Sequence, residues 1–187
     1  MPDPRTIRIL RLGMRSLTLL ASIVTAGAIA CSAAGASPNA GELSVEGGKG
    51  LVVLDIRGAV LGRLAAGTLR VVDTTPRDRY SELVTGRRVT QERISPRTVV
   101  YRGVGLRFRM LGGGYRIVAR GSGISLSAVG RGFVLLSGER KLTTDDAGLY
   151  SLDGADCGLE PEVCLPLPDL PERYALEPEP DEVERRG

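Results

Sequence analysis

RGVGLRFRMLGGGYRIV, residues 102–118, and RGSGISLSAVGRGFVLL, residues 120–136, decide the fold of this chain of 187 residues. The two segments align without gaps at a spacing of 18 residues. Each consists of R-G-x-G, an alternating segment, G-x-G, an aromatic residue and an aliphatic run. Residues 57–72 form a weaker and shorter copy of the same pattern. The sequence therefore contains an 18-residue repeat, which covers residues 102–137.

Between the glycines of each copy, apolar residues occupy every second position, as Leu106, Phe108 and Met110 do. Such alternation gives a β-strand one buried face and one solvated face. Glycine adopts positive φ without a Cβ penalty, so the G-x-G triplets predict tight turns between strands. We expect a mainly β protein, a single antiparallel β-sandwich or open barrel built from Gly-rich hairpins. A short β-solenoid is the alternative, because the units repeat.

Composition predicts the limits of this β domain. Residues 32–49 are rich in Ser, Ala and Gly and are expected to form a flexible tether. Residues 166–187 combine prolines with acidic side chains, and this composition predicts an extended or disordered tail. The β domain is therefore expected to cover residues 50–165, a length that supports one core.

Residues 1–31 have the pattern of a bacterial export signal. Four arginines precede a short apolar run, residues 17–30, which ends in small residues. This run is shorter than the roughly 20 apolar residues that a spanning helix needs. A longer helix would include arginines, which are costly inside a bilayer. We expect an exported protein, with an N-terminal transmembrane anchor as the alternative.

Residues 28–31, Ala-Ile-Ala-Cys, resemble the lipobox of bacterial lipoproteins. The resemblance implies that Cys31 is lipidated and anchors the protein on the outer face of the cytoplasmic membrane. Ala28 departs from the family pattern, in which leucine is commonest at that position. Ordinary cleavage after Ala-x-Ala would instead release a secreted protein. Both outcomes stay open at this point.

The other two cysteines, Cys157 and Cys164, enclose six residues. A disulfide can close a loop of this span in an oxidising compartment. We therefore expect a structural disulfide, which leaves Cys31 as the unpaired cysteine.

The charges segregate along the chain. Residues 50–141 carry 17 basic and 6 acidic side chains, whereas residues 142–187 carry 3 basic and 13 acidic ones. Arginine forks suit phosphate and carboxylate groups, so arginines of the repeat are candidates for binding an anionic envelope polymer or lipid headgroup. These candidates are Arg102, Arg107, Arg109, Arg116, Arg120 and Arg131. The alternative is an ordinary solvated surface. Nucleic acid is not an expected partner of an exported protein.

The chain has no histidine, which excludes Ser-His-Asp and Cys-His catalysis and every histidine metal ligand. We expect no cofactor and favour a non-catalytic binding or structural module. A hydrolase that uses carboxylates, or a lone serine such as Ser125 or Ser127, is the alternative. The acidic stretch around Asp153 and Asp156 is a weak calcium candidate, with a solvated loop as the default. Asp55 is expected to pair with Arg57 on one strand face.

Overall fold

The computed structural model describes residues 41–77, 82–139 and 147–177. The predicted signal segment and Cys31 lie outside these ranges. The described residues form antiparallel strands of one sheet, with a single 3-10 turn and no α-helix among them. The prediction of a mainly β, antiparallel fold is confirmed.

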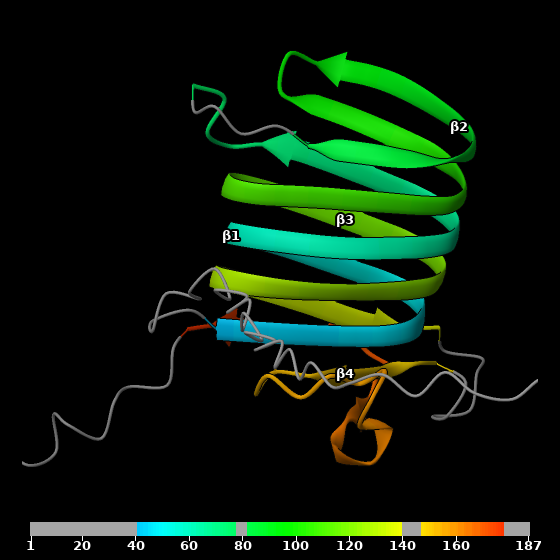
Figure 1. Ribbon diagram of the computed structural model, residues 1–187, viewed down its shortest axis with the longest axis vertical. Coiled ribbons are helices and arrows are strands. Elements are labelled where there is room, and N and C mark those ends of the chain that lie inside the picture. The colour runs from blue at the N-terminus through cyan, green and yellow to red at the C-terminus, as the bar shows by residue number, and fades with distance from the viewer. Residues whose placement is uncertain (1–40, 78–81, 140–146, 178–187) are drawn as a thin grey trace, which may run out of the picture. The chain divides into compact units, whose positions relative to one another are not determined.

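Two long strands, β1 (Gly41–Asp73) and β3 (Thr98–Gly138), make up most of the sheet. The strand β1 pairs with β3 along both of its edges: Leu54, for example, faces Ile117 on one side and Val134 on the other. The two strands therefore wind together as a double-stranded coil (Figure 1). Thr68 faces both Arg102 and Arg120, which occupy equivalent positions of the two repeats. The 18-residue repeat thus corresponds to one turn of the coil.

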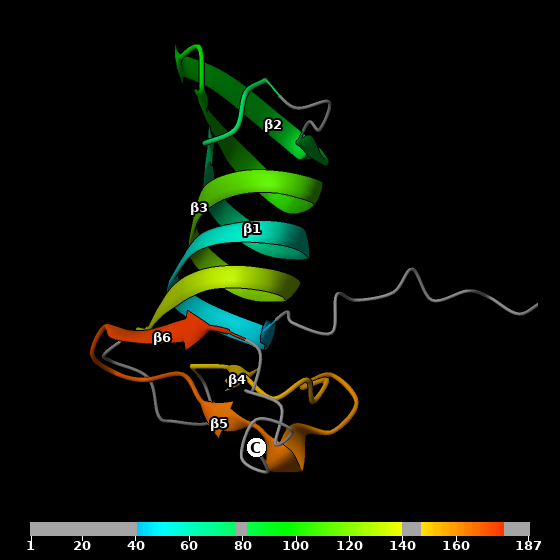
Figure 2. The same ribbon diagram turned by 90° about the vertical axis from the view of Figure 1, so that its left-hand side faces the viewer.

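Glycines divide each turn of the coil into two halves, which lie in two layers (Figures 1 and 2). Layer A consists of residues 41–48, 59–66, 104–111 and 122–129. Layer B consists of residues 51–57, 68–73, 98–102, 115–120 and 132–137. Alternate side chains of both layers point inward, and the core includes the fully buried Leu64, Leu106 and Ile124 of layer A and Leu54, Ile117 and Val134 of layer B. This arrangement fits the predicted sandwich or open sheet, and its stacked turns are the feature expected of the solenoid.

The repeat glycines lie at corners within continuous strands, so the prediction that they join hairpins is wrong. At Gly121, φ is +148°, and a Cβ would overlap the carbonyl oxygen of Ala66. The backbones of β1 and β3 cross closely at this corner, where the chain passes from one layer to the other within one continuous strand. Corners and hairpins both need glycine, which explains why the motif alone did not distinguish them.

Short strands cover the two ends of the coil. At one end, β2 (Leu83–Ser95) pairs with the beginning of β3 through a true hairpin, in which Ser95 faces Thr98. At the other end, β4 (Leu149–Ser151) pairs with β1 and with β5 (Leu165–Pro166). The 3-10 turn η2 (Pro161–Val163) precedes β5, and β6 (Glu172–Leu176) pairs with the last turn of β3.

The ordered domain is longer than the predicted range 50–165 at both ends. Residues 41–49 belong to β1 instead of the expected tether, because Leu43 and Val45 alternate into the core. Residues 166–177 belong to the fold instead of the expected tail, because Leu167 and Leu176 are also buried there. A few apolar side chains therefore order segments whose overall composition is polar.

Candidate functional site

The six arginines predicted to bind anions are all exposed, but they do not form one ladder. Arg107 and Arg109 lie in layer A, where their neighbours across the sheet include Arg63 and Leu61. The layer-B arginines of this set are Arg102, Arg116 and Arg120. Arg131 lies beside the Gly130 corner and faces Arg57. The glycines at 112–114 account for the split, since the chain changes layer there.

Layer B gathers the three predicted arginines around a fourth, Arg70. We call Arg70, Arg102, Arg116 and Arg120 the arginine cluster. Arg70 directly faces Val118 on one neighbouring strand, so Arg116 and Arg120 are its diagonal neighbours there. It faces Val100 on the other side, which makes Arg102 a third diagonal neighbour. Cross-strand diagonal positions lie about 7–8 Å apart, within reach of long side chains.

Two arginines of the cluster are paired and two are not. The Nε and Nη2 atoms of Arg116 donate to Oδ2 of Asp55 at 2.8 and 2.5 Å. Arg102 donates from Nη1 to Oε2 of Glu92 at 2.8 Å. Arg70 and Arg120 form no ion pair with any residue that the structure describes. The four arginines of the cluster and the two carboxylates paired with them together carry a net charge of +2.

The prediction that Asp55 pairs with Arg57 is wrong. The register places Asp55 directly opposite Arg116, whereas Arg57 faces Gly114 and Arg131. Neighbours across a sheet are closer than residues two positions apart on one strand face. The Asp55–Arg116 ion pair thereby links β1 to β3 within the arginine cluster.

A groove of about 680 Å³ runs beside Arg120 along one column of glycine corners. Its lining includes Gly50, Gly67, Gly121, Ser122 and Ser137. Because glycine has no side chain, the backbones of β1 and β3 approach each other closely at these stacked corners. The groove and the arginine cluster therefore share Arg120 and lie next to each other on the coil.

A second hollow, of about 620 Å³, lies on layer A and includes Ser125 and Ser127. The Ser125 hydroxyl is nearly buried and accepts a hydrogen bond from the Gly47 backbone N–H at 3.2 Å. Glu46, which also lines the hollow, forms an ion pair with Arg63, in which Oε1 of Glu46 lies 2.8 Å from Nη2 of Arg63. Within the described ranges neither serine hydrogen-bonds to a carboxylate, so the hollow holds no assembled nucleophile and base.

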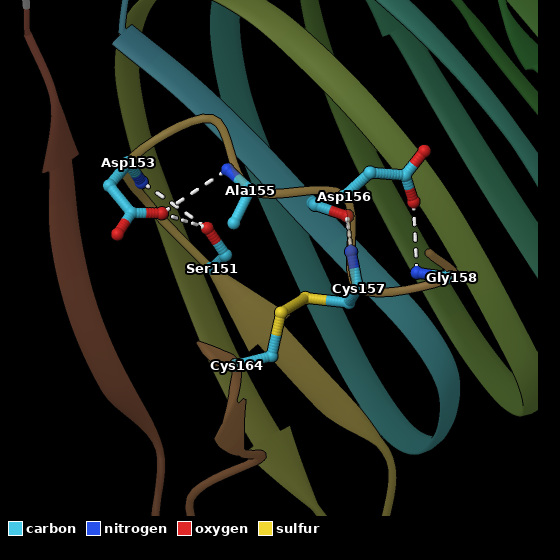
Figure 3. Close-up of a disulfide and its surroundings, with 8 residues drawn as sticks. Ser151, Asp153, Ala155, Asp156, Cys157, Gly158 and Cys164 are labelled. Carbon is cyan, nitrogen blue, oxygen red and sulfur yellow. Dashed lines mark hydrogen bonds between the residues drawn. A yellow bond between two sulfur atoms is a disulfide. The ribbon is translucent and has the colours of Figure 1, made fainter. Parts of the chain in front are cut away.

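The predicted disulfide between Cys157 and Cys164 is confirmed by a bonding S–S distance of 2.11 Å and a Cα–Cα distance of 5.8 Å (Figure 3). The Cys157 backbone N–H also donates to the Ser44 hydroxyl of β1 at 3.2 Å. The disulfide loop is therefore attached to the first turn of the coil.

Asp153 and Asp156 each accept a hydrogen bond from the backbone N–H two residues later, in the turns just before and at the start of this loop (Figure 3). Asp153 accepts hydrogen bonds from the Ser151 hydroxyl and the Ala155 backbone N–H, and these bonds lower the pKa of its carboxyl. Asp156 accepts a 2.9 Å hydrogen bond from the Gly158 backbone N–H. In the described part of the chain, no group of three or more His, Cys, Asp or Glu side chains is placed to hold a metal ion.

No family model, curated protein or solved structure matches this chain. Among the residues that the structure describes, no helix is both long and apolar enough to cross a membrane.

Sequence reasoning missed Arg70 and its neighbour Thr68, which faces both Arg102 and Arg120. The signal that could have found Arg70 is the weak repeat copy at residues 57–72. In that copy Arg70 precedes Val71 and Val72 as Arg116 precedes Ile117 and Val118. An alignment of all three copies therefore places Arg70 at the position of a candidate that the repeat had already identified.

Proposed function

We propose that this protein is an exported, non-catalytic binding module of the cell envelope that holds an anionic polymer or lipid headgroups on its arginine cluster. The observation that carries the proposal is the pair Arg70 and Arg120, diagonal neighbours without an ion pair among the described residues. A guanidinium group that is not in an ion pair can offer its planar set of N–H donors to phosphate or carboxylate oxygens.

The spacing of the cluster favours a ligand with repeated charges. Arg102 and Arg120 lie on the two strands that flank Thr68, one turn of the coil apart. Neighbouring strands are about 4.8 Å apart, so these two positions are separated by about 10 Å along the stack. A polymer or a headgroup array can contact both, and the Thr68 hydroxyl between them provides a further donor.

The test of this proposal removes the two unpaired charges. With Arg70→Gln and Arg120→Gln together, we expect about 30-fold weaker binding to polyphosphate or to phosphatidylglycerol vesicles, since each arginine contributes about 1 kcal/mol at an anionic surface. Affinity measured by titration at low salt gives the result for each probe separately, and phosphatidylcholine vesicles give the uncharged background.

The matched control is Arg107→Gln with Arg109→Gln, which removes the same charge from layer A. This control is expected to retain most of the affinity, because its arginines lie outside the cluster. If both double variants lose the same affinity, only the net charge matters and the cluster is not a site.

Export and lipidation are tested at Cys31. In a bacterial host, the wild-type chain is expected to fractionate with membranes, whereas Cys31→Ser is expected to lose most of this association because it removes the lipidated thiol. Immunoblots of membrane and soluble fractions provide the measurement. Full retention of Cys31→Ser in the membrane fraction, with an unprocessed N-terminus, would contradict lipidation and favour the transmembrane anchor.

A further inference from the structure

The strand β2 forms one outer edge of the sheet, whose order is β2-β3-β1-β4-β5. None of its 13 residues is buried, and only its β3-facing edge is paired within the described ranges. Two of its apolar side chains, Leu83 and Ile94, are 52% and 53% exposed. The strand also carries three arginines but only one acidic residue, and these arginines are Arg87, Arg88 and Arg93. Long exposed edges of this kind are docking surfaces unless something covers them.

The opposite end of the coil is acidic, which complements the basic charge of β2, and it also exposes apolar side chains. Residues 147–172 contain six acidic side chains and no basic one; the acidic side chains are Asp153, Asp156, Glu160, Glu162, Asp169 and Glu172. Four large apolar side chains are more than half exposed there, at 80% for Leu159, 55% for Val163, 58% for Leu165 and 59% for Leu170. The Cys157–Cys164 disulfide and η2 fix this loop, so little conformational entropy is lost when it docks.

These two ends cannot contact each other within one copy, because they lie at opposite ends of the coil (Figures 1 and 2). We propose that the acidic, apolar end of one copy docks on the β2 edge of a second copy, with the two coils stacked head to tail. Acidic side chains of the first copy face Arg87, Arg88 and Arg93 of the second, while the exposed leucines cover Leu83 and Ile94. Such a heterologous contact leaves one free end on each copy, so the association extends beyond dimers.

The contact is made by side chains rather than by continuation of the sheet. Pro166 occupies half of the terminal strand β5 and has no backbone N–H to offer a new strand. Arg88 has a φ of +52°, and the β2–β3 register shifts on both sides of Arg87, which interrupts the regular edge of β2. The charges on both ends are exposed, so salt is expected to weaken the contact.

Sedimentation velocity of the full chain tests this proposal. At about 0.5 mM chain and about 50 mM salt, where screening is weak, we expect reversible association that is lost near 500 mM salt. Two charge-reversed forms separate the ends. One carries Arg87→Glu and Arg93→Glu on β2, and the other carries Glu160→Lys and Glu162→Lys on the disulfide loop. Each form alone is expected to sediment as a monomer.

Mixing the two forms gives the decisive result. Each form retains one intact end, and the two reversed ends are complementary to each other, so an equimolar mixture is expected to regain the association that neither form shows alone. A monomeric wild-type chain at low salt would overturn the proposal, as would association of either form alone, which indicates contact between like ends. Association that persists equally in all samples would also overturn it, because the contact would then lie elsewhere. The arginine cluster is intact in both forms, so anion binding reports separately on the proposed function.

Discussion

Replacing Gly121 with alanine is expected to lower the free energy of unfolding by about 4 kcal/mol, since the corner combines a backbone penalty with a forced displacement. The φ of +148° is one that L residues rarely adopt. The new Cβ would overlap the Ala66 carbonyl oxygen and lie 2.8 Å from Cα of Gly67. Both neighbours are backbone atoms of β1, so no side-chain rotation relieves the overlap. Gly67 meets the same restriction from the Arg120 carbonyl, which makes the crossing reciprocal.

Gly47→Ala is the matched control, because it separates the cost of φ from that of the crossing. Gly47 has a φ of +67°, but a Cβ there would meet nothing within 4 Å. Its replacement is expected to cost about 1 kcal/mol, the usual penalty of a left-handed alanine. Urea denaturation followed by circular dichroism measures both variants. If both variants lose the same free energy of unfolding, the close backbone approach at the Gly121 corner adds nothing to the cost of the positive φ, and the prediction is wrong.

The difference between corner and hairpin also defines how far the sequence could predict this fold. Alternating residues such as Leu106, Phe108 and Met110 predicted strands with one buried face, and all three are buried. The glycine triplets predicted turns, but a turn motif does not say which strand pairs with which. Pairing in this protein joins positions far apart in the chain, for example Leu54 with Val134. Local patterns therefore predicted strands with one buried face but not how these strands continue through the corners and wind around each other.

The candidate site shows the same limit. Composition and repeat identified Arg102, Arg116 and Arg120, whose shared layer follows from register across several corners. Arg107 and Arg109 have the same exposure and the same sequence pattern, yet they lie on the other layer. The ion pairs of Arg116 and Arg102 likewise depend on partners 61 and 10 residues away. Charge pattern alone could not determine which guanidinium groups stay available.

Removing the disulfide, by Cys157→Ser with Cys164→Ser, is expected to lower the free energy of unfolding by about 2.5 kcal/mol, the chain-entropy value for so short a loop. The loop is coupled to the rest of the domain at several points. The Cys157 backbone N–H is bonded to Ser44, and the neighbouring strand β4 pairs with β1. Beyond the loop, Leu167 and Leu176 enter the core. Loosening residues 157–164 therefore affects the coil as a whole and not only its end.

Reductant provides the matched comparison for this prediction. The wild-type chain is expected to lose the same 2.5 kcal/mol, roughly, when dithiothreitol opens the disulfide, whereas the double-serine form is expected to be insensitive to it. Denaturant midpoints with and without reductant measure both effects. An unchanged wild-type midpoint would show that the disulfide is peripheral to stability. The expected loss instead makes full stability depend on an oxidising compartment, which is the kind of compartment that the proposed export would reach.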